Sequence, residues 1–430
     1  MTSYPDRDVA PAPTSTRRRA IDRALTWTSE WIGDLTAPRE GVEKIARGTL
    51  VRVLGLWAVG RVVNFAFLYG AFLLSSVFNW RFGPEGLPVT TFFRFLSDWD
   101  AARYGRISQI GYSVPLPVDG SGRILTNDWA FLPVFPWLER ILSEALGGMP
   151  WQTAGIVLSI AASAGATTVL FVLLRGVTTP RAAWWAVVLF TFGPLSFIMV
   201  LGYAESLFLL LLFTALLLAR RRRYGWIVPI AVVLAFTRPG ALALALGLGI
   251  LFAVRWFRRG VDPFPRKQMA GLIAAAATAA IAGMAWTYIA DLITGTKNAY
   301  LLTETAWWIP YVGDGHFLPL TPWFRFFGTY LGIVGFFVVL GFMALFGWWI
   351  SSRQVRKLGL ELTAFILSYG LYLFAVFLPQ QSTFRLLLPV APAFADERLS
   401  STPRRRKVTL GGALFLQAAA VLLLWTLGNP

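Results

Sequence analysis

The stretch WIVPIAVVLAFTRPGALALALGLGILFAV, residues 226–254, decides the fold, because it is an apolar block of 29 residues with one arginine near its centre. Basic residues precede it at 220–223 and follow it at positions 255, 258 and 259. Basic flanks stay in the cytoplasm under the positive-inside rule, so the chain must enter and leave the membrane from the same side. The block is therefore predicted to form a hairpin that points outward, with its turn at Thr237-Arg238-Pro239-Gly240.

The length of this hairpin places its turn inside the membrane boundary. Each arm has about 14 residues and reaches about 21 Å, whereas the hydrocarbon core is roughly 30 Å thick. Arg238 should then cost about 3 kcal/mol unless it is paired or wetted. A phosphate about 4 Å away offsets this with about 4 kcal/mol at an effective dielectric constant of about 20. Two alternatives remain: Arg238 extends to the membrane surface, or it pairs with a protein carboxylate.

Charge and hydropathy along the rest of the chain predict eleven membrane crossings, with the N-terminus in the cytoplasm and the C-terminus outside. Residues 182–219 and 359–395 are two more apolar blocks with basic flanks, and we expect each to be an outward hairpin. Five single spans are expected at 50–78, 151–174, 269–293, 330–350 and 408–427. The inner segments then hold 27 of the 39 Lys and Arg residues and the outer segments hold 10, which supports this orientation.

The predicted organisation is a cytoplasmic tail, residues 1–49, followed by one membrane domain, residues 50–427. The tail is polar and lacks the apolar core and cleavage site of a signal peptide. Trp27 and Trp31 are four residues apart in it, so one helix there is expected to lie on the membrane surface.

Composition excludes several classes of protein. Hydrophobic residues make up 56% of the 430 residues and charged residues 14%, against about 25% charged in soluble domains, so an ordinary soluble enzyme is excluded. The net charge of +17 lies in short runs between apolar blocks, which is typical of cytoplasmic loops rather than of nucleic-acid binding. There is no Cys, and His316 is the single His, which excludes disulfides, thiolate catalysis and multi-His metal sites. Carboxylates, Arg, Tyr and amides must carry any chemistry.

Two long outer segments, 79–150 and 294–329, are rich in Pro, Gly, Trp and charge, and we expect extracytoplasmic loops with short surface helices. The first contains a polar cluster with Asp98, Trp99 and Asp100. A carboxylate beside Trp at the membrane boundary is partly desolvated, which makes it a better base for a sugar hydroxyl. Asp98 and Asp100 point in different directions, so one is expected to be catalytic and the other a helix cap.

The other hairpin tips bring further charged groups to the same face. One turns at residues 202–206 and carries Glu205, and the other turns at residues 379–385 and carries Gln381 and Arg385. Glu205 is either functional or a structural cap or ion-pair partner of an arginine. Arg385 is either functional or an interfacial anchor. His316 is expected to be a surface residue.

The order of these motifs resembles the PIG-V mannosyltransferases, which are GT-C glycosyltransferases. The resemblance covers roughly residues 95–395. It rests on Trp99-Asp100 with Tyr104, on the stretches AFLPVFP (130–136), YAESLF (203–208) and TRPG (237–240), and on later signatures around 294–307 and 382–389. The chain departs from the pattern at Phe384-Arg385, where the family commonly has an Arg-Tyr pair, and in having Asp98 as a second acid.

The resemblance implies an all-α polytopic membrane protein of the GT-C fold, with about eleven transmembrane helices and a long first extracytoplasmic loop. It implies transfer of mannose, with inversion, from polyprenyl-phosphate-mannose to a lipid- or glycan-linked acceptor hydroxyl at the outer face of the plasma membrane. Membrane lipids are the other expected partners, and neither a metal nor another cofactor is required. The expected roles are catalysis by Asp100, with Asp98 and Glu205 as further candidates; donor-phosphate binding by Arg238 and Arg385; and substrate binding by Trp99, Tyr104, Tyr203 and Gln381.

Two readings from other classes compete with this one. A transporter or flippase of a lipid-linked sugar favours inverted repeats and ionisable residues near the bilayer midplane, whereas the charged tips here collect at the outer side. A non-catalytic envelope scaffold would tolerate changes of Asp100, Glu205 and Arg238. The acceptor remains open, and so does the choice of mannose over another polyprenyl-linked sugar.

Overall fold

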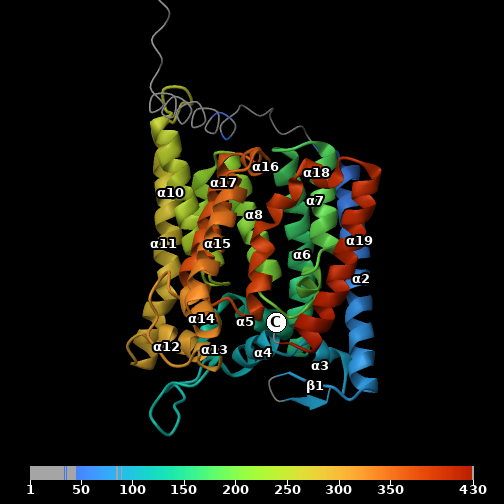
Figure 1. Cartoon of the computed structure of the whole chain (residues 1–430), viewed down its shortest axis with the longest axis vertical. Coiled ribbons are helices and arrows are strands. Elements are labelled where there is room, and N and C mark those ends of the chain that lie inside the picture. The colour runs from blue at the N-terminus through green and yellow to red at the C-terminus, as the bar shows by residue number, and fades with distance from the viewer. Residues whose placement is uncertain (1–32, 34, 36–44, 84–85, 89, 429–430) are drawn as a thin grey trace, which may run out of the picture.

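The computed structural model describes residues 33, 35, 45–83, 86–88 and 90–428. The expected surface helix at Trp27 and Trp31 lies outside the described residues. The described chain is a bundle of long, roughly aligned helices, and most of the short elements gather at its two ends (Figure 1).

Within the described residues, five helices are long and apolar enough to cross a membrane. They are α2 (Arg47–Val77), α6 (Trp151–Arg175), α11 (Arg266–Thr294), α15 (Ile333–Ile350) and α19 with its π-helical end η5 (Pro403–Ala420 and Val421–Thr426). Each of them overlaps most of one of the five single spans predicted from the sequence, although α15 begins at Ile333, after a break at Gly332, rather than at residue 330. The count of eleven crossings stays a prediction.

Three pairs of shorter helices occupy the predicted hairpins. They are α7 (Pro180–Phe192) and α8 (Glu205–Arg220), with η2 (Ser196–Val200) between them; α9 (Ile227–Ala235) and α10 (Ala241–Phe257), preceded by η3 (Tyr224–Trp226); and α17 (Leu360–Val376) and η4 (Gln381–Ala395). The breaks between these helices overlap the predicted turns, although α8 begins at Glu205 and η4 at Gln381, inside the turns predicted at 202–206 and 379–385. The arms of the second hairpin are unequal, since α9 has 9 residues and α10 has 17, rather than about 14 each. The second arm of the last hairpin is a 3-10 helix that contains Pro389 and Pro392.

Short helices fill the two long outer segments, as predicted. They are α3 (Phe92–Leu96), α4 (Asp100–Ile110), η1 (Asp128–Ala130) and α5 (Val134–Ala145) in the first, and α12 (Ala299–Ala306), α13 (Ile309–Val312) and α14 (Pro322–Leu331) in the second. The first segment also holds two antiparallel strands, β1 (Arg81–Phe82) and β2 (Leu87–Pro88), which an all-α fold does not include. These elements lie at one end of the bundle (Figure 1). The short helices α16 (Arg353–Arg356) and α18 (Glu397–Ser400) lie at the other end (Figure 1).

A buried arginine on α2 helps to hold the first hairpin in place. Arg61 donates hydrogen bonds to the carbonyl oxygens of Thr191 (3.4 Å) and Ser196 (3.3 Å). Asn64, one turn further along α2, donates to the Ser196 hydroxyl at 2.9 Å. A cation at the last carbonyls of α7 is favourable because that end of a helix carries partial negative charge. The contacts fix α2 against the hairpin that continues into Glu205.

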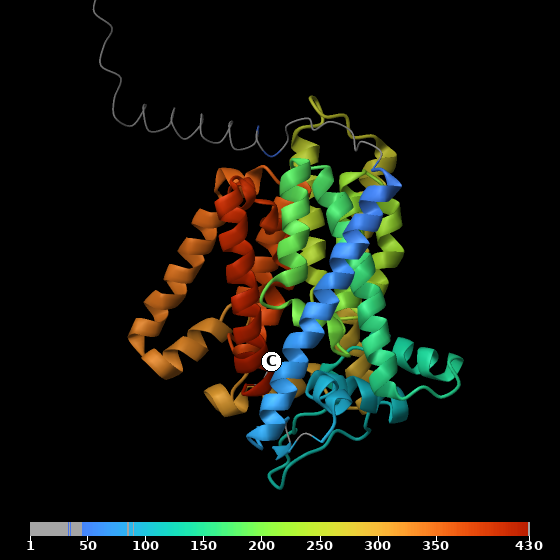
Figure 2. The same ribbon diagram turned by 90° about the vertical axis from the view of Figure 1, so that its right-hand side faces the viewer.

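The C-terminal helix packs back against the first outer segment. Trp425 is fully buried and meets the rings of Phe82, Phe95, Phe197 and Tyr203 at centroid distances of 5.7 to 6.5 Å. Aromatic pairs at such distances add to the burial of their area. The end of the chain thus lies beside α2 and the short elements that follow it (Figure 2).

Candidate functional site

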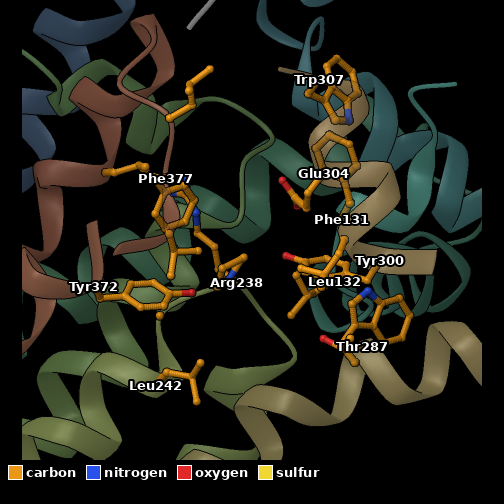
Figure 3. Close-up of a pocket in the computed structure, with 18 of the residues that line it drawn as sticks. Phe131, Leu132, Arg238, Leu242, Thr287, Tyr300, Glu304, Trp307, Tyr372 and Phe377 are labelled. Atoms are coloured by element: carbon orange, nitrogen blue, oxygen red, sulfur yellow. The ribbon is translucent and has the colours of Figure 1, made fainter. Parts of the chain in front are cut away.

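A cavity of about 450 Å³ opens at the end of the bundle where the outer segments gather. Its walls come from α4, α12, the turn between α9 and α10, the end of α17 and the start of η4. Its polar lining residues include Asp100, Tyr104, Arg238, Thr287, Tyr300, Glu304, Thr305, Tyr311, Tyr372, Gln380, Ser382 and Arg385. Figure 3 shows Arg238 and Tyr372 on one side of the cavity and Glu304 on the other. A volume of this size suits a small-molecule site.

Asp100 and Arg385 form an ion pair in this cavity. The Asp100 carboxylate Oδ2 lies 2.5 Å from Arg385 Nη1. Asp100 is the first residue of α4, where the N-terminal end of the helix favours a negative charge. Arg385 comes from η4, so the pair joins two segments that are far apart in the sequence.

Glu205 and Arg238 form a second ion pair, and Arg385 links it to the first. Glu205 Oε1 contacts Arg238 Nη1 and lies 3.4 Å from Arg385 Nη1. The Glu205 side chain is only 3% exposed, and a buried carboxylate needs such partners. The ion-pair alternative left open for Glu205 and Arg238 is therefore what the structure contains. Each arginine is shared between the cavity and a carboxylate.

Tyr203 contacts both Asp100 and Arg385 of this ion-pair network but does not line the cavity. Its ring is fully buried, and the Arg385 guanidinium lies 5.3 Å from its centroid. Its hydroxyl oxygen accepts a hydrogen bond from the Asp100 amide at 3.3 Å. The Ser159 hydroxyl on α6 binds both the amide and the carbonyl of Tyr203, at 3.2 and 2.9 Å. Tyr203 therefore fixes the positions of Asp100 and Arg385.

The turn that carries Arg238 depends on Gly240. Its φ of +144° lies in a region that side chains rarely adopt, and a Cβ at this position would meet the Phe208 ring. The turn is also fastened to the first outer segment, because the Val134 amide donates to the Phe236 carbonyl at 3.0 Å. These contacts fix the position of the turn and therefore the place where Arg238 lines the cavity.

Asp98 and Asp100 occupy different surroundings, as expected, but the expectation that one of them caps a helix is wrong for α4, whose N-cap is Trp99 with no side-chain hydrogen bond. Asp98 Oδ1 accepts a hydrogen bond from the Trp99 amide at 2.8 Å, and its carboxylate lies against Gly83 beside the β1–β2 hairpin. Asp98 and Trp99 are not among the residues that line the cavity. Trp99 itself has a φ of +56°, a strained value for a non-glycine residue, and it turns the chain so that Asp100 begins α4.

Of the remaining residues that were expected to bind substrate, one lines the cavity and the other does not. Tyr104 is buried and lines the cavity, packed against Phe131 and Phe135. Gln381 does not line it, whereas Gln380 does. His316 is exposed, which agrees with its expected place at the surface.

The residues around 127–129 connect the first outer segment to α12 and to the long helix α11. Asn127 donates to the Thr303 hydroxyl on α12 at 3.0 Å. The Trp286 indole donates to the Trp129 carbonyl at 3.0 Å, and their rings stack at 5.2 Å. Asp128 is buried and pairs with Arg103 at 3.1 Å. Their geometry makes these residues a scaffold for the cavity wall.

Glu304 is a cavity residue that the sequence did not single out. It lies on α12 one turn after Tyr300, which hydrogen-bonds to it. Burial raises the pKa of Glu304 to about 7, and the nearby Asp100 charge acts in the same direction, while the Tyr300 hydrogen bond opposes both. The i, i+4 spacing of Tyr300 and Glu304 puts both on one helix face, which was the available signal.

The described residues contain no group of three or more His, Asp or Glu side chains placed to hold a metal ion. The cavity instead presents two arginines and three carboxyl groups, counting Glu205 behind Arg238. Arginines suit a phosphate ester, because the guanidinium group offers several donors in a fixed fork. Carboxylates suit hydroxyl groups, which they accept hydrogen bonds from.

No protein-family model matches the sequence, and no curated protein resembles it closely enough to count as a relative. Solved structures of an oligosaccharyltransferase from Archaeoglobus fulgidus are distantly similar. One, AglB with an inhibitory peptide and a dolichol-phosphate, is 15% identical with a TM-score of 0.40 and matches 85% of this chain and 56% of that chain. Another, with zinc and sulfate, is 15% identical with a TM-score of 0.38 and matches 87% and 53%. The chain thus spans about half the length of these structures, and so distant a likeness assigns it no activity.

Proposed function

We propose that the chain is an integral membrane glycosyltransferase of the GT-C type, which transfers mannose from polyprenyl-phosphate-mannose to an acceptor hydroxyl at the outer face of the plasma membrane. The observation that carries the proposal is the convergence of Asp100, Arg238 and Arg385 on one cavity. These three residues come from three separate segments, and their motifs are among those that resemble the PIG-V family.

The arginines supply the charge that a departing lipid phosphate requires. In the transfer, the acceptor oxygen forms a bond to the anomeric carbon of mannose while the bond from that carbon to the phosphate oxygen breaks. The leaving group is polyprenyl phosphate, and its negative charge is stabilised by Arg238 and Arg385. Positioned donors of this kind act best in a site that excludes water.

Asp100 is the base in this proposal. It takes the proton of the acceptor hydroxyl as the new bond forms, which is general-base catalysis. A phosphate that binds Arg385 competes with Asp100 for the same guanidinium group. Donor binding thus releases the Asp100 carboxylate to accept a hydrogen bond from the acceptor. Glu205, held between the arginines, keeps both of them in place when the phosphate leaves.

The apolar part of the cavity fits the start of a lipid chain. Leu242, Met284, Val376, Phe377 and Leu378 line it beside the arginines. Isoprenoid units next to the phosphate can bury their surface there at about 25 cal/mol per Å². A water-soluble nucleotide sugar would gain nothing from such walls.

Transfer of radiolabelled mannose tests the proposal. Purified full-length protein is incubated with polyprenyl-phosphate-mannose, total envelope lipid and EDTA, and the lipid products are separated by chromatography. Asp100→Asn is compared with Asp119→Asn, a matched control in an exposed loop where Asp119 pairs with Arg123. We expect transfer by the wild type and the control, and a loss of about 1000-fold in Asp100→Asn.

The proposal fails if the donor stays intact with the wild-type protein and envelope lipid. Transfer of mannose by Asp100→Asn at the wild-type rate would show that Asp100 is not the base. Movement of intact donor across the membrane of proteoliposomes, without transfer of mannose to an acceptor, would instead indicate a flippase.

A further inference from the structure

Glu304 occupies a distinct place in the cavity. Its carboxyl group enters from α12, on the side facing Arg238 and Tyr372 (Figure 3). Its hydrogen-bond partner Tyr300 lies on the same helix, and among the described residues no arginine nitrogen lies within 4.0 Å of its carboxylate oxygens. Glu304 therefore stands outside the network of Asp100, Arg385, Glu205 and Arg238, and nothing in the proposed transfer uses it.

The wall around Glu304 is aromatic. Trp307 and Trp308 follow it on the chain and line the cavity with it. The Arg103 guanidinium lies 5.3 Å from the Trp307 ring centroid, and Phe131 meets the same ring edge-on at 6.4 Å. These contacts hold the indole in one orientation. The wall thus combines a carboxyl group that binds hydroxyls with flat apolar rings that pack against carbon-bound hydrogens.

In an inverting transfer, the geometry of the reaction determines on which side of the donor sugar the acceptor must bind. The acceptor oxygen must approach the anomeric carbon from the side opposite the leaving phosphate. Arg238 and Glu304 lie on opposite sides of the cavity (Figure 3), so a phosphate bound by Arg238 leaves the acceptor to arrive from the side that Glu304 occupies. Only a group with several hydroxyls and an apolar face uses both features of this wall.

We infer that Glu304, Tyr300 and Trp307 form an acceptor subsite for a sugar or polyol ring, so that the acceptor is itself a glycan or a polyol headgroup. The inference rests on the proposed function and names its acceptor class. Glu304 accepts hydrogen bonds from ring hydroxyls beside the reacting one, and Tyr300 orients the carboxyl group. The indole covers one face of the ring. The raised pKa of Glu304, about 7, leaves the ionised form available at neutral pH.

Direct binding gives a test that needs no donor. Full-length protein in lipid nanodiscs is mixed with methyl α-D-mannopyranoside, and bound ligand is detected by saturation-transfer NMR. We expect a signal with the wild type, a loss of about fivefold in Glu304→Gln, and partial recovery in Glu304→Asp. The control is Glu144→Gln, which makes the same change at an exposed residue of α5 that pairs with Arg140.

Transfer kinetics give the second test. The donor is polyprenyl-phosphate-mannose, and the competing acceptors are octyl α-D-mannopyranoside and a serine-containing peptide amide. Glu304→Gln should raise the KM for the octyl sugar about tenfold, with the donor KM and the slow hydrolysis of donor by water unchanged. If Glu304→Gln does not fold, Tyr300→Phe replaces it, and we expect its KM for the octyl sugar to rise about threefold.

The two proposals can fail separately. Transfer to the peptide alone, or an equal change in both KM values, overturns the sugar subsite and leaves the transferase standing. Binding of methyl α-D-mannopyranoside that depends on Glu304, with neither transfer nor donor hydrolysis, supports the subsite and overturns the transferase. Absence of any binding and an unchanged acceptor KM in Glu304→Gln overturn the subsite.

Discussion

The Asp100 carboxylate and the Arg385 guanidinium lie 2.5 Å apart, and Arg385 also lies 3.4 Å from Glu205. Glu205 in turn contacts Arg238. Two carboxylates and two guanidinium groups thus form one chain of contacts at the cavity, and their formal charges cancel. Loss of any one member leaves an uncompensated charge in a poorly solvated place, which affects stability as well as chemistry.

We expect Arg385→Gln to destabilise the protein by about 2 kcal/mol, which is less than the roughly 3 to 5 kcal/mol for breaking a fully buried pair. The estimate is low because the Asp100 and Arg385 side chains are 22% and 12% exposed. The double variant Asp100→Asn/Arg385→Gln removes both charges and should recover part of the thermal stability. Neither variant should transfer mannose. Tm measured in detergent and the transfer assay separate the two effects.

Equal Tm values for Arg385→Gln and the wild type would show that the ion pair contributes nothing to stability. Transfer by the double variant at more than about a tenth of the wild-type rate would contradict the catalytic role of the pair.

The two neighbouring acids should respond differently to loss of charge. Asp98 bonds to the Trp99 amide and does not line the cavity, so Asp98→Asn should keep transfer within about threefold of the wild type while lowering Tm. Asp100→Asn should abolish transfer and keep donor binding. Transfer assays of both variants in parallel test which acid is the base. A larger loss of kcat in Asp98→Asn than in Asp100→Asn would assign the base role to Asp98.

Arg238 should act on the donor rather than on the acceptor. Arg238→Ala removes one of two cations available to the phosphate, so we expect the donor KM to rise about tenfold, with the acceptor KM within about twofold. The control is Arg140→Ala, an exposed arginine of α5. An equal rise in both KM values would mean that Arg238 serves only to hold Glu205.

Much of the architecture follows from apolar length and charge placement. The turn at 237–240 and the positions of the five long helices agree with the sequence prediction, because a basic flank and an apolar run are local signals. The unequal arms of α9 and α10 were not predictable in this way. The arm lengths depend on the position of the turn, where Gly240 packs closely against the Phe208 ring. This is a tertiary contact that the local sequence does not show.

The charges of the candidate site were predictable, and pairing of Glu205 with an arginine was one of the alternatives, but the pairing of Asp100 with Arg385 was not predicted. Asp100, Arg238 and Arg385 were expected in one region, and the structure brings them together. Gln381 was expected to bind substrate, but a 3-10 start to η4 puts its neighbours Gln380 and Ser382 at the cavity instead. Glu304 was missed because its i, i+4 spacing from Tyr300 shows only a shared helix face, whereas its place opposite Arg238 depends on the fold.

The acceptor subsite predicts a pH dependence. Burial raises the pKa of Glu304 to about 7, so its carboxylate form is lost as the pH falls below that value. A protonated carboxyl group accepts fewer hydrogen bonds, and the KM for octyl α-D-mannopyranoside should therefore rise as the pH is lowered from 8 to 6. In Glu304→Gln this KM should be high and nearly constant. A wild-type acceptor KM that does not vary over this range would contradict the prediction.

Glu139 on α5 gives a prediction about stability that does not depend on the function. It is almost fully buried, accepts a hydrogen bond from the Ser108 hydroxyl at 3.3 Å, and packs near Gly155 on α6. Burial raises its pKa from 4.5 to about 8, and the Ser108 hydrogen bond opposes this shift. The folded state therefore holds a proton between these pH values that the unfolded state has lost.

Stability should consequently decline as the pH rises from about 4.5 to about 8, by up to about 1.4 kcal/mol per pH unit. Glu139→Gln resembles the protonated form and removes this decline. We expect its Tm in detergent to match the wild type at pH 5 and to exceed it by several degrees at pH 8. Wild-type and variant Tm values that change in parallel from pH 5 to pH 8 would show that Glu139 is ionised in the folded protein, with a charged partner or water reaching it through α5.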